Sequence, residues 1–191
     1  MQPAMYKGGY TLKDYLTWPE GERWEIIEGV AYMLSAPTGA HQSLALGIAS
    51  ELRTFLKGKT CRVYISPYDV VFTDDENTDT VVQPDVLVVC DPKKYQNGKR
   101  VIGAPDIAVE VLSPSSVMND YDKKAALYQK HGVKEYWIVS PEARAISQRV
   151  LQDGRYGDAT IYEDGVLHSS VLEGFELDIK ELFAELDDQP E

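Results

Sequence analysis

Cysteine and long apolar runs are scarce in this sequence. Its two cysteines, Cys61 and Cys90, form no CxxC pair, and Cys90 ends an apolar run, which is typical of a buried free thiol. No run approaches the roughly 18 apolar residues of a membrane span. The first residues, MQPAMYKGGYTLKDYL, lack the basic-then-apolar pattern of a signal peptide. We therefore expect a cytoplasmic protein with reduced thiols and no membrane partner.

Basic residues are also few. The 191 residues include 19 lysines and arginines against 31 acids, a net charge of −12, which argues against a nucleic-acid partner. However, residues 151–191 hold twelve of the acids and two of the bases, so residues 1–150 are almost neutral. The charge therefore does not exclude nucleic acid, but any such site must rely on a local basic patch.

Hydrophobic residues make up 43% of the chain, enough for one domain with its own core. We expect that domain to span residues 1–186, and residues 187–191 to form a disordered acidic tail. Apolar and turn residues predict strands at 61–75, 80–90, 105–112 and 134–141, a strand pair at 23–34, and β-hairpins up to residue 178. Helices are expected at 11–21 and 41–58, from Ser116 or Asn119 to Gly132, and at 178–186.

The order of these elements predicts the fold class. The strands at 105–112 and 134–141 flank a helix, so they are expected to be parallel and joined by a right-handed crossover. The result is an α/β (α+β) fold, in which a mixed β-sheet has a helix on each side and extra strands come from both ends of the chain.

A carboxylate interrupts one of these strands. In DIAVEVL, residues 106–112, Glu110 lies among apolar residues, where an unpaired charge is costly. Asp85 follows Pro84 and opens the neighbouring apolar run VLVVC, so two carboxylates enter adjacent strands, where they repel each other. A divalent cation between them removes this penalty. Mg²⁺ or Mn²⁺ is the expected ion, since Mg²⁺ favours one or two carboxylates completed by water and substrate phosphate.

The following helix supplies a cation. Asp120, Lys124 and Tyr128 are four residues apart and share one helix face. From that face Lys124 could reach back toward the carboxylates, where it would orient a water or stabilise charge on a scissile phosphate. Asp85, Glu110 and Lys124 are therefore the predicted catalytic residues.

These residues form a known pattern. A PD, a gap and then E-x-K, within helix–strand–strand–strand–helix–strand, is the layout of the PD-(D/E)XK nuclease superfamily, which the chain resembles. More narrowly, it resembles a bacterial family of uncharacterised restriction-endonuclease-like proteins. The matching stretches are RWEIIEGVAYMLSAPTGAHQ, QPDVLVV, PDIAVEVLSPSS, DYDKKAALY, HGVKEYWIVSPEAR and GFELDIKELF. The resemblance covers nearly the whole chain and implies a restriction-endonuclease-like core.

The chain departs from the superfamily pattern at Leu112, because a lysine is expected two residues after Glu110. The resemblance implies that this lysine has moved to the next helix, at Lys124. It further implies three additional site groups, namely the Val111 carbonyl as a third metal ligand beside Asp85 and Glu110, and Glu28 and His41 on the N-terminal side of the site.

Each candidate also has a purely structural interpretation. Glu110 could pair with a buried arginine or lysine, and Lys124 could face solvent. Asp120 could simply favour the helix N-terminus. His41 could be a helix cap or a core histidine, and Glu28 could be a turn acid.

The loop DPKKYQNGKR joins the Asp85 strand to the Glu110 strand. Its basic residues could hold a DNA backbone close to the metal, and they are Lys93, Lys94, Lys99 and Arg100. The stretch KGKTCR, residues 57–62, could extend this patch. The alternative is a solubilising surface loop.

The leading hypothesis is a metal-dependent endonuclease that hydrolyses DNA phosphodiester bonds. One rival is a non-catalytic member of the same fold that binds nucleic acid or protein. A second is a phosphodiesterase that acts on small nucleotides, with the basic loop as a lid. A homodimer is expected if both DNA strands are cut.

Overall fold

The computed structural model describes residues 5–19, 21–95, 98–113, 119–184 and 186–187. The helices are α1 (Leu12–Tyr15), α2 (Gly39–Phe55), α3 (Asn119–His131) and α4 (Ile179–Ala184), with a 3₁₀ turn, η1, at Pro92–Tyr95. The strands are β1 (Met5–Lys7), β2 (Trp24–Ile27), β3 (Val30–Met33), β4 (Arg62–Ile65), β5 (Val70–Val71), β6 (Val81–Val82), β7 (Val86–Val89), β8 (Val101–Ile102), β9 (Ile107–Val111), β10 (Glu135–Ser140), β11 (Ala145–Gln152), β12 (Arg155–Tyr156), β13 (Thr160–Tyr162), β14 (Val166–His168) and β15 (Glu176–Asp178).

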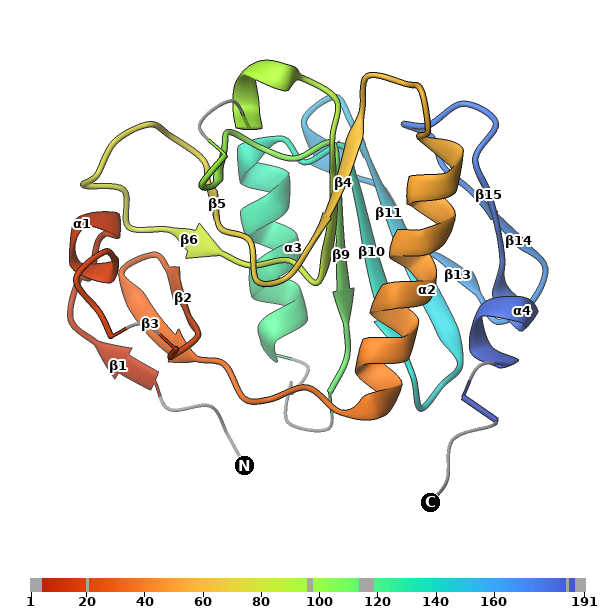
Figure 1. Ribbon diagram of the computed structural model, residues 1–191, viewed down its shortest axis with the longest axis horizontal. Coiled ribbons are helices and arrows are strands. Elements are labelled where there is room, and N and C mark those ends of the chain that lie inside the picture. The colour runs from red at the N-terminus through yellow and green to blue at the C-terminus, as the bar shows by residue number, and fades with distance from the viewer. Residues whose placement is uncertain (1–4, 20, 96–97, 114–118, 185, 188–191) are drawn as a thin grey trace.

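The larger sheet carries a long helix on each face (Figure 1). It has seven strands in the order β12-β11-β10-β9-β7-β4, with β13 paired to β11. Successive side chains on a strand point to opposite faces. On β9, Ile107 therefore packs in the cluster that contains Ile48 of α2, while Ala108 packs in the cluster that contains Leu127 of α3. Glu110, two residues after Ala108, therefore points to the face that α3 covers.

The smaller sheet has six strands in the order β1-β3-β2-β6-β5-β8. It takes one piece from each of two apolar runs, so the prediction of one strand at 61–75, bent or edge-like at Pro67, and one at 80–90 is wrong in that each run forms two strands. Pro67 separates β4 from β5, and Pro84 separates β6 from β7, with one piece of each run in each sheet. Proline has no N–H for a β-ladder, which is why each run stops pairing at this point. Within each of these two runs the chain thus passes once from one sheet to the other, and Asp85 lies at the passage in the second run.

The predicted pair of parallel strands joined through a helix is confirmed. Strands β9 and β10 are parallel, and α3 lies between them in the chain. Helix α2 begins at Gly39, two residues before the predicted start, because Thr38 caps it. Helix α3 begins at Asn119, and the alternative start at Ser116 lies outside the described residues. In the described part of the chain, no helix is long and apolar enough to cross a membrane.

The two cysteines form a disulfide in this structure, so the prediction of free thiols is wrong. Cys61 precedes β4 and Cys90 follows β7. These strands are antiparallel, with Arg62 opposite Val89, which places the two cysteines opposite each other. The apolar run before Cys90 could not reveal this, since it does not show which strands pair. The argument for a reducing compartment therefore loses its support.

Candidate active site

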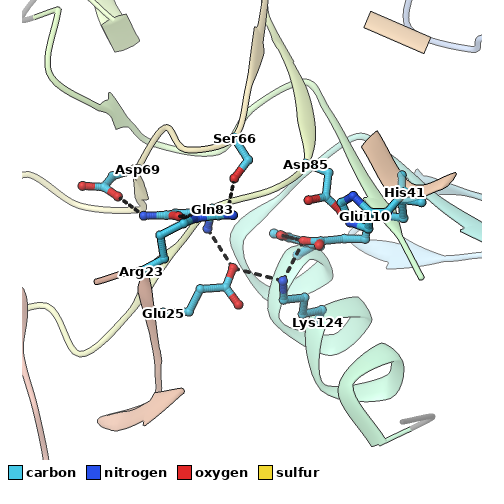
Figure 2. Close-up of polar contacts among 11 residues, drawn as sticks. Arg23, Glu25, His41, Ser66, Asp69, Gln83, Asp85, Glu110 and Lys124 are labelled. Atoms are coloured by element: carbon cyan, nitrogen blue, oxygen red, sulfur yellow. Dashed lines mark hydrogen bonds and ion pairs between the residues drawn. The ribbon is translucent and has the colours of Figure 1, made fainter. Parts of the chain in front are cut away.

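A cavity opens beside the carboxyl end of β9, where residues of both sheets and of α2 and α3 meet. Its volume is about 150 Å³, and it is open to solvent on one side. Figure 2 shows Asp85, Glu110 and His41 close together, with Lys124 and Glu25 beside them. All five side chains line the cavity.

Asp85 is held by a main-chain group and a histidine. Its Oδ2 accepts a hydrogen bond from the Val111 N–H at 2.8 Å and lies 3.1 Å from His41 Nε2. The Thr38 hydroxyl accepts a hydrogen bond from the His41 N–H at 3.3 Å, and this cap puts His41 in the first turn of α2. Because both contacts use Oδ2, Asp85 Oδ1 has no hydrogen bond among the described residues.

Two side chains of α3 contact the Glu110 carboxylate. Its Oε1 lies 2.9 Å from Lys124 Nζ and accepts a hydrogen bond from the Tyr128 hydroxyl at 2.6 Å. Lys124 and Tyr128 are one helical turn apart, so both reach the same carboxylate. The structure thus brings Asp85, Glu110 and Lys124 to one cavity, while their chemical roles stay predictions. The side chain of Asp120, predicted on the same helix face, lies outside the described residues.

Glu25 is a third acid at this cavity, and the sequence analysis missed it. This β2 residue is 3% exposed. Its Oε1 lies 3.0 Å from Lys124 Nζ and accepts a hydrogen bond from the Gln83 N–H at 2.8 Å. The available signal was an acid between Trp24 and Ile26 in a short strand, which is the pattern that singled out Glu110.

Glu28 does not reach the cavity, although the resemblance placed it there. It lies in the turn after β2 with a φ of 50°, and its 65% exposed side chain pairs with Lys130 at 3.2 Å. Side chains alternate along a strand, so a residue three positions after Glu25 points to the other face. Glu25 therefore takes the position expected for Glu28.

Around Lys124, the three carboxylates of Glu25, Asp85 and Glu110 outnumber one ammonium. Burial raises the pKa of Glu110 to about 7, an increase that Lys124 opposes and that the charges of Asp85 and Glu25 enlarge. Burial lowers the pKa of Lys124, but Glu110 and Glu25 outweigh that effect. The pKa of Lys124 is therefore above its usual value, and this side chain is charged at neutral pH.

The donors at the cavity suit a divalent cation. Asp85 Oδ1 and Glu110 Oε2 make no hydrogen bond within the described ranges, and carboxylate oxygens are the ligands that Mg²⁺ prefers. Among the described residues there is no group of three or more histidine, cysteine or acidic side chains that could hold a metal. Mg²⁺ does not need such a group, because it keeps waters and substrate phosphates beside one or two carboxylates. Asp85 and Glu110 therefore fit this ion, with the Val111 carbonyl as a candidate third ligand.

The basic loop lies away from these carboxylates. Strands β7 and β9 are antiparallel neighbours, so Asp85 before β7 and Glu110 near the end of β9 share one end of the sheet. The loop from residue 91 to 100 follows the opposite end of β7 and leads into β8 of the smaller sheet. Lys94 Nζ in this loop donates a hydrogen bond to the Ala104 carbonyl at 2.7 Å. Lys93 and Lys94 therefore lie at the end of β7 away from Asp85 and Glu110, and the binding of DNA by Lys93, Lys94, Lys99 and Arg100 stays a prediction.

Comparisons with known proteins agree with one another. Residues 12–180 match the sequence model of the Uma2 family, described as "Putative restriction endonuclease". A protein of Synechocystis sp. that is named only as uncharacterised is 29% identical over 131 residues, which cover 67% of each chain. A crystal structure from Anabaena variabilis, titled as a "putative nuclease belonging to DUF820", matches with a TM-score of 0.77 and 22% identity, over 93% of this chain and 99% of that one. This likeness confirms the predicted restriction-endonuclease-like fold.

Proposed function

The chain belongs to the Uma2 family of restriction-endonuclease-like proteins, and we propose that it is a divalent-cation-dependent nuclease that hydrolyses phosphodiester bonds of DNA. One observation carries the proposal, which is the position of Asp85, Glu110 and Lys124 at a single cavity. Phosphodiester hydrolysis needs groups that offset charge on the phosphate and fix the reacting atoms. Two acids that suit a metal ion, together with a fixed ammonium, meet this need.

Asp85 and Glu110, with the Val111 carbonyl, are the proposed ligands of a Mg²⁺ or Mn²⁺ ion. When bound, such an ion supplies a Lewis acid that draws charge from phosphate oxygens. His41 orients Asp85 through its Nε2 contact, and Tyr128 orients Glu110 through its hydroxyl.

Lys124 is the proposed electrostatic group. An ammonium has three N–H donors, and Glu25 and Glu110 take two of them among the described residues. The third can serve a phosphate oxygen of the substrate or the attacking water. As water attacks phosphorus and the bond to the leaving sugar oxygen breaks, negative charge grows on the phosphate oxygens, and the fixed ammonium offsets it.

Calorimetric titration of Mn²⁺ into the wild type and Glu110→Gln tests the proposed ligand. We expect the variant to bind Mn²⁺ about 10–100-fold more weakly, because glutamine keeps the size of the side chain but removes the anionic oxygen. The matched control is Glu176→Gln, at an acid of β15 that is 66% exposed, and it should bind as the wild type does.

Incubation with supercoiled plasmid then tests the reaction itself. The wild type and Glu176→Gln should nick or linearise the plasmid with Mn²⁺, Glu110→Gln should not, and a chelator should stop the reaction. A wild type that binds Mn²⁺ and leaves every DNA substrate intact would disprove the nuclease proposal.

Mn²⁺ binding should weaken as the pH falls below about 7. Glu110, with its pKa raised to about 7 chiefly by burial, takes up a proton in that range, and a protonated carboxyl is a poor metal ligand. We expect the affinity to fall by up to about tenfold per pH unit below that value. The measurement is the Mn²⁺ dissociation constant from about pH 8 to about pH 5.5, a range around the raised pKa. An affinity that does not change over this range would contradict the prediction.

A non-catalytic binding protein is the second candidate, and one observation favours it. Glu110 already has partners in Lys124 and Tyr128, so its charge needs no metal. This function predicts that Mn²⁺ has no effect and that Glu110→Gln binds nucleic acid or protein as the wild type does. The third candidate is a phosphodiesterase that acts on small nucleotides. Measuring whether duplex DNA competes with a nucleotide substrate would distinguish it from the DNA nuclease.

A further inference from the structure

Arg23 places a guanidinium in the wall of the same cavity. It directly precedes β2 and lines the cavity together with Asp85 and Glu110. Because side chains alternate along a strand, Arg23 and Glu25 point to the same side. Figure 2 shows Arg23 beside Gln83 and Ser66, with Lys124 on the other side of the Glu25 carboxylate. The cavity therefore has an acidic part and, separate from it, one fixed arginine.

Neutral groups hold this arginine. Its Nε and Nη2 each donate to Gln83 Oε1 at 3.4 Å, and Nη2 also donates to the Ser66 hydroxyl. No carboxylate in the described part of the chain lies within ion-pair distance of Arg23. Arg23 is partly buried and has no acidic partner among the described residues.

Gln83 separates Arg23 from a nearby acid. The Gln83 amide donates to Asp69 Oδ1 at 2.9 Å, and its oxygen accepts from Arg23 on the other side (Figure 2). The Tyr15 hydroxyl also donates to Asp69 Oδ1, at 2.8 Å. The amide therefore fixes the guanidinium, and these hydrogen bonds polarise one another. Asp69 strengthens the hold on Arg23 without forming an ion pair with it.

We infer that Arg23 binds a phosphate group of the substrate, next to the phosphate that is cleaved. The inference rests on the proposed nuclease function and names a binding residue for it. Arginine suits this role because it keeps its charge, and because Nη1, which makes no hydrogen bond within the described residues, can donate to a phosphate oxygen while Nε and Nη2 stay held. In a cavity rich in carboxylates, a separate fixed cation also attracts the anionic strand and orients it. The phosphate group can belong to duplex DNA or to a free nucleotide.

The salt dependence of DNA binding tests the contact. The affinity of Glu110→Gln protein for a fluorescein-labelled duplex is measured by anisotropy between about 50 and 200 mM salt, since this variant is not expected to cut. Each phosphate contact adds about 0.9 to the slope of log K against log salt. Adding Arg23→Met should lower that slope by about 0.9 and weaken binding about tenfold at the low-salt end. Adding Arg23→Lys instead should keep the slope, because the charge is retained.

Arg53→Met in the same Glu110→Gln protein is the matched control. Arg53 is exposed in the last turn of α2, about 18 Å along the helix from His41, and its replacement should leave slope and affinity unchanged. An equal loss of slope in Arg53→Met would overturn the inference, because the contact would not be specific to the cavity.

A purely structural role for Arg23 gives a different result. In that case Arg23→Met lowers the melting temperature and leaves the slope and affinity of the folded protein unchanged, which would overturn the inference. Arg23-dependent binding of thymidine 5′-monophosphate in place of duplex would support the phosphate contact and assign it to a nucleotide. If the wild type fails to cut DNA, the nuclease proposal is overturned. The inference about Arg23 is then still tested, because the slope of log K against log salt is measured on DNA that is not cut.

Discussion

Replacing Lys124 by methionine is expected to slow DNA cleavage about 10²–10³-fold and to lower the free energy of unfolding by about 3–5 kcal/mol. The Lys124 side chain is 14% exposed and pairs with both Glu110 and Glu25. Methionine keeps most of the volume but leaves two buried carboxylates without their counter-charge. Urea denaturation measures the stability, and plasmid cleavage at a temperature where the variant is folded measures the rate.

The stability loss should depend on pH with a definite sign. A glutamate in the unfolded chain has a pKa of about 4.3, while burial raises the pKa of Glu110 in the folded protein, and loss of Lys124 raises it further. An acid with a raised folded-state pKa destabilises the fold once the unfolded chain has lost the proton. The difference between the wild type and Lys124→Met should therefore be larger at about pH 8 than at about pH 5, on either side of this raised pKa. A difference that is constant with pH would contradict this account.

A second variant separates the two effects of Lys124. Lys124→Met combined with Glu25→Gln removes one of the two unpaired charges, so it should recover part of the lost stability. It should recover none of the cleavage, because the ammonium is still missing. Cleavage that returns together with stability would show that Lys124 acts only as a structural counter-charge.

Replacing Glu135 by alanine is expected to lower the free energy of unfolding by about 3–5 kcal/mol. Glu135 begins β10 and is fully buried, and its carboxylate accepts six hydrogen bonds. The donors come from Trp137, Gln148 and the segment 169–171. Alanine leaves these buried donors without an acceptor, whereas in the native protein they stabilise the charge and fix that segment to the sheet.

Two comparisons make the Glu135 prediction specific. Glu176→Ala, at an acid that is 66% exposed, should change the stability by less than about 0.5 kcal/mol. Glu135 lies opposite Ile107, at the end of β9 away from Glu110, so the folded Glu135→Ala protein should keep the cleavage rate of the wild type. A stability loss below about 1 kcal/mol would mean that water replaces the carboxylate at little cost.

The sequence was informative where one residue conflicted with its immediate neighbours. Glu110 conflicts with the apolar strand around it, and Asp85 opens a strand that is otherwise buried. Four-residue spacing then selected Lys124. The same local reasoning predicted α2 and the parallel pair of β9 and β10, since each has a clear apolar period of its own.

The remaining features depend on contacts between distant segments, which local patterns do not contain. In the run from 80 to 90, only the pairing of β6 with β2 and of β7 with β9 shows that Pro84 divides the run between the two sheets. Glu28 was predicted at the site and Glu25 was missed, because only the folded strand shows which of the two acids faces the cavity. The Cys61–Cys90 bridge likewise follows from which strands pair. The cytoplasmic location and the homodimer stay predictions.

The ion pair between Lys124 and Glu25 joins residues that are 99 positions apart in the chain. During synthesis, β2 and β3 are complete long before α3 has left the ribosome, so early segments carry the acids without the lysine. Contacts of such high sequence separation form late in folding. The contact between Glu25 and Lys124 can therefore form only after α3 has been made, and under the proposed function a chain that ends before α3 lacks the ammonium for phosphodiester hydrolysis.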